Sequence, residues 1–145
     1  MKITIEALPD GQEEEIVIRS NSIDSELMDL IYALKAGRNR LTAFAEDGII
    51  KLDSREVFYF ESVDNKVCAC CEKSVYEIKQ KLYELESIFD HTDFVRISKA
   101  MIVNVSKISK IVPTFNGKLE ALLKNGEKVV ISRQYVPDLK KKLGI

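Results

Sequence analysis

The sequence offers few groupings of side chains that could perform catalysis or hold a metal ion. Cys68, Cys70 and Cys71 are near neighbours, but a strand would point Cys68 and Cys70 to one face and Cys71 to the other. A structural zinc site needs four ligands, and the chain has no second pair of thiols and a single histidine, His91. We therefore interpret the cysteines as small buried hydrophobic residues and expect no metal and no cofactor.

His91 lacks the partners that a general base requires. Covalent catalysis needs three groups that converge in space, and the adjacent Thr92 and Asp93 lie in a loop, where neighbours seldom point at one target. The chain contains no G-x-S-x-G elbow, no P-loop and no G-x-G-x-x-G turn. The sequence therefore predicts a protein that is not an enzyme, and it implies no small-molecule substrate.

Basic side chains are more informative, because they are concentrated in one part of the chain. Residues 1–93 hold 11 Lys and Arg against 20 Asp and Glu, a net charge of −9. Residues 94–145 hold 11 against 3, a net charge of +8, so the whole chain carries −1. A basic third on an acidic chain points to a polyanion such as nucleic acid. The alternative is a solubilising face that happens to carry lysines.

Several of these cations fall at predicted strand ends or turns, where a lysine stays solvated and suits phosphate contacts. Arg133 differs, because it follows a strand that ends at Ser132 and precedes the last helix. A guanidinium held at a rigid strand end can bind O6 and N7 of guanine with two hydrogen bonds. The alternative for Arg133 is a salt bridge with a carboxylate such as Asp138.

Short strands must position these side chains. The hairpin signals Asp-Gly, Asn-Gly and Asn-Gly at 47–48, 116–117 and 125–126 separate apolar runs, which favours a sandwich or a small stack of sheets. Ile78, Leu82, Leu85 and Phe89 have helical spacing, and 135–143 reads as a short closing helix. The predicted strands are 41–45, 49–52, 57–60, 67–71, 74–76, 95–97, 101–105, 108–112, 118–123 and 128–131.

The first forty residues form a separate unit. Segments 2–8 and 15–19 read as a hairpin around a Pro-Asp-Gly turn, and Ser22 or Asn21 offers a helix N-cap. A helix with one apolar stripe follows, and a hairpin with one helix is too small for a core of its own. We therefore expect residues 1–40 to pack on the rest of the chain or to act as a dimer element. The stripe comprises Ile23, Leu27, Leu30, Ile31 and Leu34.

Three segments resemble LytTR-type DNA-binding domains. FVRISKAMIVN at 94–104 resembles the block F-x-R-x-H-(R/K)-S-(Y/F)-(I/L)-V-N, with Ser98 where histidine is common. LLKNGEKVVISRQY at 122–135 resembles the ending L-x-(N/D)-G-x-x-(I/V)-P-(I/V)-S-R-(R/N)-Y, and VFYFES at 57–62 resembles the strand I-x-Y-(I/F)-E-(A/S). The resemblance covers about residues 41–145, which we expect to be the DNA-binding domain.

The resemblance implies a mainly β fold (α+β overall), an elongated stack of short antiparallel sheets with one helix, whose loops enter successive major grooves. It implies three contact regions, with Asn65 suited to adenine and with Lys99 and Arg133 suited to guanine or phosphate. It also makes Asn104 a structural hydrogen-bonding residue. The DNA-binding residues expected in all are Asn65, Lys66, Ser98, Lys99, Lys107, Lys118, Arg133 and Gln134.

The predicted function is therefore a bacterial, cytoplasmic transcription regulator that binds double-stranded DNA, at direct-repeat sites and as a homodimer. About forty residues precede the domain, too few for the phospho-receiver of most relatives, so phosphorylation control is not expected. No apolar run is long enough for membrane insertion, and three cysteines do not suggest a disulfide framework. The competing interpretation is a non-enzymatic β module that binds a protein partner.

Overall fold

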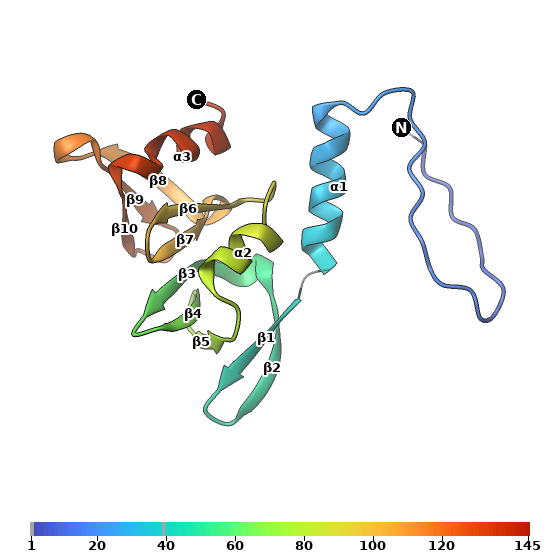
Figure 1. Cartoon of the computed structure of the whole chain (residues 1–145), viewed down its shortest axis with the longest axis horizontal. Helices are drawn as coiled ribbons and strands as arrows, with labels where there is room; N and C mark the ends of the chain where they lie inside the picture. Colours follow the sequence, from blue (N-terminus) through green and yellow to red (C-terminus); the bar gives the residue numbers. More distant parts are fainter. Residues whose placement is uncertain (1, 39) are drawn as a thin grey trace.

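The computed structural model describes residues 2–38 and 40–145, which form two antiparallel sheets and a few helices (Figure 1). The strands are β1 (Arg40–Ala45), β2 (Gly48–Asp53), β3 (Val57–Val63), β4 (Lys66–Cys71), β5 (Val75–Ile78), β6 (Phe94–Ser98), β7 (Met101–Asn104), β8 (Ile108–Pro113), β9 (Leu119–Leu123) and β10 (Lys128–Ile131). The α-helices are α1 (Ser25–Arg38), α2 (Leu82–Ile88) and α3 (Val136–Leu143), and the 3-10 turns are η1 (Ser54–Glu56), η2 (Val105–Lys107), η3 (Phe115–Gly117) and η4 (Arg133–Tyr135).

Seven strands form the larger sheet, in the order β2-β1-β5-β4-β3-β7-β6, and the smaller sheet has the order β10-β9-β8. Each strand predicted between residues 41 and 131 is present, with its ends moved by at most a few residues. The glycine of each predicted hairpin turn has a positive φ, as the turn chemistry requires. The mainly β architecture expected from the sequence is confirmed.

Both faces of the larger sheet are covered near its centre. Phe60 of β3 lies opposite Ile102 of β7, and both are buried in a first core against α2. Tyr59 lies opposite Val103, and both belong to a second core that the smaller sheet and α3 complete. Alternation along the strand therefore sends adjacent residues into different cores, and the two sheets pack through the second core.

The helix predicted from the spacing of Ile78, Leu82, Leu85 and Phe89 is shorter than expected. It begins at Leu82, because Ile78 belongs to β5 and pairs with Ala43 and Val67. Ile78 is nevertheless buried in the same first core as Leu82 and Leu85. A strand residue and helix residues can be buried in one core. The helical spacing therefore predicted a helix that is one turn too long at its start.

The predicted N-terminal hairpin is wrong for the described residues. Residues 2–9 and 12–20 form no strand, and the turn is closed only by the Gln12 amide, which donates to the Pro9 carbonyl at 3.3 Å. An isolated two-stranded hairpin is marginal in water, and Ile3 and Ile5 find no cover, being 84% and 92% exposed. Figure 1 shows this segment as a long loop beyond α1, away from the sheets.

Helix α1 forms as predicted, although its cap differs. The Leu27 amide donates to Asp24 Oδ1 at 2.9 Å, so Asp24 caps the helix in place of Ser22 or Asn21. The Tyr32 ring stacks on His91 with centroids 4.1 Å apart, which joins α1 to the loop after α2. No helix in residues 2–38 or 40–145 has the length and hydropathy that crossing a bilayer requires.

Candidate nucleic-acid interface

The first predicted contact region is the two-residue turn between β3 and β4. Asp64 and Asn65 both have positive φ, 52° and 65°, a conformation that Asn and Asp adopt more readily than other residues with side chains. This turn places Asn65 at the tip and Lys66 at the first position of β4, and both side chains are exposed. Lys81 Nζ donates to the Asn65 carbonyl at 3.4 Å, so a further cation borders this turn.

The second region is the turn from Ser98 to Ala100, between β6 and β7. Arg96 holds it, because its Nε donates to the Ser98 carbonyl at 2.7 Å and its Nη2 donates to the Lys99 carbonyl. Arg96 Nη1 also pairs with Glu86 of α2. With its backbone fixed in this way, the Lys99 side chain is free to extend from an ordered turn, and it is exposed.

The third region follows β10. The Ser132 amide donates to the Ile97 carbonyl at 2.9 Å, which places this turn beside the end of β6. Arg133 and Gln134 are exposed, and among the described residues no ion pair joins Arg133 to Asp138. The salt bridge with Asp138 that the sequence left open as an alternative is therefore not formed.

Backbone hydrogen bonds tie the three regions into a row, which we call the turn row (64–66, 98–100 and 132–134). The Ser62 amide donates to the Ala100 carbonyl at 2.8 Å, which joins the strand before the first region to the second region. The Ser132–Ile97 bond joins the third region to the strand before the second. In Figure 1 the β3–β4 and β6–β7 turns lie on the side of the molecule away from α1. The structure thus brings together Asn65, Lys66, Ser98, Lys99, Arg133 and Gln134.

A groove between the first two turns contains residues that sequence reasoning missed. Its lining includes Asn65 and Lys99 from the turn row, with Lys81 and Tyr83 from the start of α2. Tyr83 is 72% exposed, so its ring is accessible at the edge of this groove. Neither residue belongs to a motif, so only the fold, which lays α2 beside these turns, could reveal them.

Of the two remaining predicted lysines, the structure places one near the turn row and one away from it. Lys118 precedes Leu119, which pairs with Ile131, so Lys118 and Arg133 lie at the same end of the smaller sheet. Lys107 follows β7 at the end opposite Ala100, and its Nζ lies 5.3 Å from the centroid of the Phe58 ring. The structure therefore does not bring Lys107 together with the other predicted residues.

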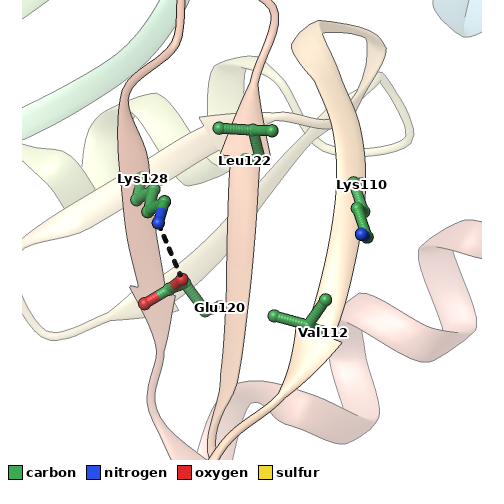
Figure 2. A pocket seen from close by; sticks show the side chains of 5 residues that line it. All are labelled: Lys110, Val112, Glu120, Leu122 and Lys128. Atoms are coloured by element: carbon green, nitrogen blue, oxygen red, sulfur yellow. Dashed lines mark ion pairs between the residues drawn. The ribbon is translucent and has the colours of Figure 1, made fainter.

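The outer face of the smaller sheet carries other cations, as Figure 2 shows. Lys110 and Lys128 lie on it beside Glu120, and Lys128 Nζ is 4.0 Å from Glu120 Oε1. The ion pair offsets part of the positive charge of this face, and Val112 and Leu122 lie between the charged groups. Lys110 lies within β8 and Lys128 begins β10, and neither belongs to the turn row.

The cysteines point to the faces that the sequence predicted, but only Cys70 is buried, and Cys68 and Cys71 are half-buried. Cys68 and Cys70 contact the second core and Cys71 contacts the first. Burial raises the pKa of Cys70 and of Cys71 to about 11, so neither thiol is a ready nucleophile at neutral pH. Within the described ranges no three His, Cys, Asp or Glu residues gather in a way that could hold a metal ion.

Comparison with known proteins identifies relatives of the β part. The family model described as the LytTr DNA-binding domain matches residues 47–144. The sensory transduction protein LytT of Bacillus subtilis is 29% identical over 110 residues, and that of Bacillus anthracis is 31% identical over 110. These matches cover 76% of this chain but only 46% and 45% of the two LytT proteins, so the chain spans less than half of their length.

Two further comparisons cover other extents. An uncharacterized HTH-type transcriptional regulator of Staphylococcus aureus is 26% identical over 147 aligned positions, covering 100% of this chain and 99% of that protein. The solved LytTr DNA-binding domain of a response regulator from Bacillus cereus superposes with a TM-score of 0.71 at 30% identity. That superposition covers 75% of this chain and 100% of the solved domain.

Proposed function

The chain belongs to the LytTr DNA-binding domain family, and we propose that it is a bacterial transcription regulator that binds duplex DNA by inserting loops into successive major grooves. The observation that supports this most is the turn row, in which two hairpin turns and the turn between β10 and α3 are linked by backbone hydrogen bonds at their strand ends. These bonds fix the backbone at each turn, which limits the backbone entropy lost when the side chains bind.

Each turn contributes a different chemistry in this proposal. Asn65 can bind adenine through its amide, and Arg133 can bind guanine through its guanidinium. Lys99 binds guanine or phosphate, Ser98 and Gln134 add polar contacts, and Lys66 and Lys118 neutralise phosphates. Lys81 and Tyr83 extend this surface along the groove, whereas Lys107 lies outside it. The proposal assigns the chain no catalytic activity and no cofactor, and it places the protein in the cytoplasm with the chromosome.

A salt titration tests DNA binding against the alternative of a protein-binding module. The affinity for a duplex selected from random sequences should fall steeply as salt rises, because each neutralised phosphate releases counterions. Lys66→Ala should lower the slope of log affinity against log salt by about 1. Lys73→Ala is the matched control, since Lys73 is exposed just beyond the other end of β4. An affinity that does not change with salt concentration would refute the proposal.

We also propose that two copies bind direct repeats and that residues 2–38 join them. The predicted apolar stripe is partly uncovered in one chain: Leu30 and Leu34 of α1 are each 39% exposed, and Ile23, just before the helix, is 73% exposed, whereas Leu27 and Ile31 are half-buried. A second copy is a suitable cover because each copy would present the same stripe. Sedimentation of wild type and of Leu30→Glu should give a dimer and a monomer, and a monomeric wild type would contradict the proposal. Direct-repeat duplexes should bind more tightly than inverted repeats of the same half-sites.

A further inference from the structure

The stem of Arg133 lies against a glycine in a different hairpin. Gly117 ends η3, in the turn between β8 and β9, and Arg133 begins η4 after β10. A Cβ atom built on Gly117 would lie 3.3 Å from Arg133 Cγ and 3.5 Å from Cδ. The first distance is shorter than an ordinary carbon–carbon contact, so a side chain at 117 would require the arginine stem to shift.

This contact matters because it restrains the stem of a flexible side chain whose backbone is already held. The Arg133 backbone is held by the preceding Ser132–Ile97 hydrogen bond, and the stem crosses the flat surface that Gly117 leaves. An arginine has several rotatable bonds, and confining them before binding lowers the entropy lost when the guanidinium meets its target. A planar guanidinium also needs the correct orientation to form two parallel hydrogen bonds.

We propose that Gly117 is a positioning residue that seats the Arg133 stem and so determines how strongly Arg133 selects its base. The inference rests on the proposed function of Arg133 as a base-reading residue. It assigns Gly117 no contact with DNA of its own. A side chain at 117 should therefore reduce base selection only while the arginine is present.

The chain supplies a matched control in Gly126. Both glycines follow an asparagine in a β-hairpin turn, and their φ angles are +75° for Gly117 and +91° for Gly126. A side chain at either position incurs the strain of a left-handed backbone. Only Gly117 has a neighbour in the path of that side chain, since nothing lies within 4 Å of a Cβ built on Gly126.

The experiment measures base preference rather than affinity alone. Each protein is titrated onto the duplex that wild type selects from random sequences and onto copies with one guanine replaced, and the affinity ratio gives the preference. We expect Gly117→Ala to lower the preference at the Arg133-dependent guanine by about fivefold or more, the lower limit for a two-bond arginine–guanine contact. Gly126→Ala should leave this preference unchanged, although both variants lose thermal stability.

The double variant isolates the contact. In an Arg133→Ala background, Gly117→Ala should change the preference by less than about twofold, because the stem that it displaces is absent. Equal losses of preference from Gly117→Ala and Gly126→Ala, or a full loss that persists without Arg133, would overturn the inference. If Arg133→Ala itself leaves the preference intact, the proposed function of Arg133 fails instead. Should alanine prevent folding, Gly117→Asn and Gly126→Asn repeat the comparison with a residue that tolerates positive φ.

Discussion

The phenol of Tyr59 donates a hydrogen bond to Glu127 Oε2 at 2.6 Å, and this bond links the two sheets of the protein. Tyr59 lies at the centre of β3 in the larger sheet, whereas Glu127 belongs to the turn between β9 and β10 of the smaller one. Burial, and then the bond to Glu127, raise the pKa of Tyr59 above its ordinary value. The phenol therefore remains a donor throughout the neutral range.

Tyr59→Phe should lower the free energy of unfolding by about 0.5–1.5 kcal/mol, because it removes the donor of the bond between the sheets, while the exposed Glu127 keeps its bond from Asn125. Urea unfolding followed by circular dichroism measures the change. Tyr83→Phe is the control, since Tyr83 is 72% exposed and its loss of a hydroxyl should cost little. Equal effects of the two substitutions would show that the bond between the sheets contributes no stability.

Arg133→Ala should weaken binding to the selected duplex by about 1–3 kcal/mol and relax the preference at one base pair. The reason is the loss of the guanidinium from a turn that is bonded to β6 through Ser132 and that packs against Gly117 of the β8–β9 turn. Gel-shift titrations at constant salt measure the change, with Lys73→Ala as the control of equal charge. An unchanged affinity would remove Arg133 from the interface.

Arg96→Gln should loosen the turn from Ser98 to Ala100, because the shorter, neutral side chain cannot bond both carbonyls and Glu86. We expect a loss of stability of about 1–2 kcal/mol and weaker DNA binding through Lys99. Faster amide hydrogen exchange confined to residues 98–100 would identify the cause. Glu86→Gln provides the comparison, since it removes the ion pair but leaves both bonds to the turn; an equal effect would assign the role to the ion pair alone.

The contribution of Asp53 to stability should depend on pH in the acid range. Its side chain accepts hydrogen bonds from the Arg55 side chain and, at 2.9 Å, from the Arg55 amide, and these lower its pKa to about 2. A carboxylate with a lowered pKa stabilises the fold above its unfolded pKa near 4, and this stabilisation disappears as pH falls toward 2.

Asp53→Asn should therefore cost up to about 1 kcal/mol at pH 7, because a neutral amide cannot replace the charged bonds to the Arg55 side chain, and much less at pH 2. Thermal unfolding of both proteins between pH 2 and pH 7 measures this difference. Asp10→Asn, in the exposed N-terminal segment, serves as the control. A difference between Asp53→Asn and wild type that stays constant across the range would contradict the assignment.

The sequence predicted the parts of the fold that local chemistry determines. Strand alternation and Asn-Gly turns located the hairpins, and Asn104 has the structural role expected of it, since its Nδ2 donates to the Val57 carbonyl at 2.9 Å. The prediction of an N-terminal hairpin was wrong because period-two alternation cannot show whether a strand has a neighbouring strand to pair with. The predicted start of α2 was wrong because Ile78 is buried in the same core as the helix, and an apolar residue at that spacing can belong to a strand or to a helix.

The candidate interface likewise contains residues that the sequence predicted and residues that it could not predict. Motif resemblance predicted Asn65, Lys99 and Arg133 as contacts: Lys99 and Arg133 lie within the matching segments, and Asn65 lies in the turn that follows one of them. It could not locate the contact between Gly117 and Arg133 or the place of Tyr83 beside Asn65, because residues distant in sequence form them. The basic charge of the last third grouped Lys107 with the others, although opposite ends of one short strand separate Lys107 from Lys99.

The irregularity in the pairing of β3 with β4, between Val57 and Tyr59, has a consequence for how the chain tolerates change. It inverts the alternation once, so that Val57 and Phe60 enter one core while Phe58 and Tyr59 enter the other. Deleting Phe58 would restore regular alternation, with Val57 and Phe60 still in the first core and Tyr59 in the second, but it would remove a large ring from the second core. The cavity left behind would lower stability, so the length of this protein can change far more easily at its turns than in β3.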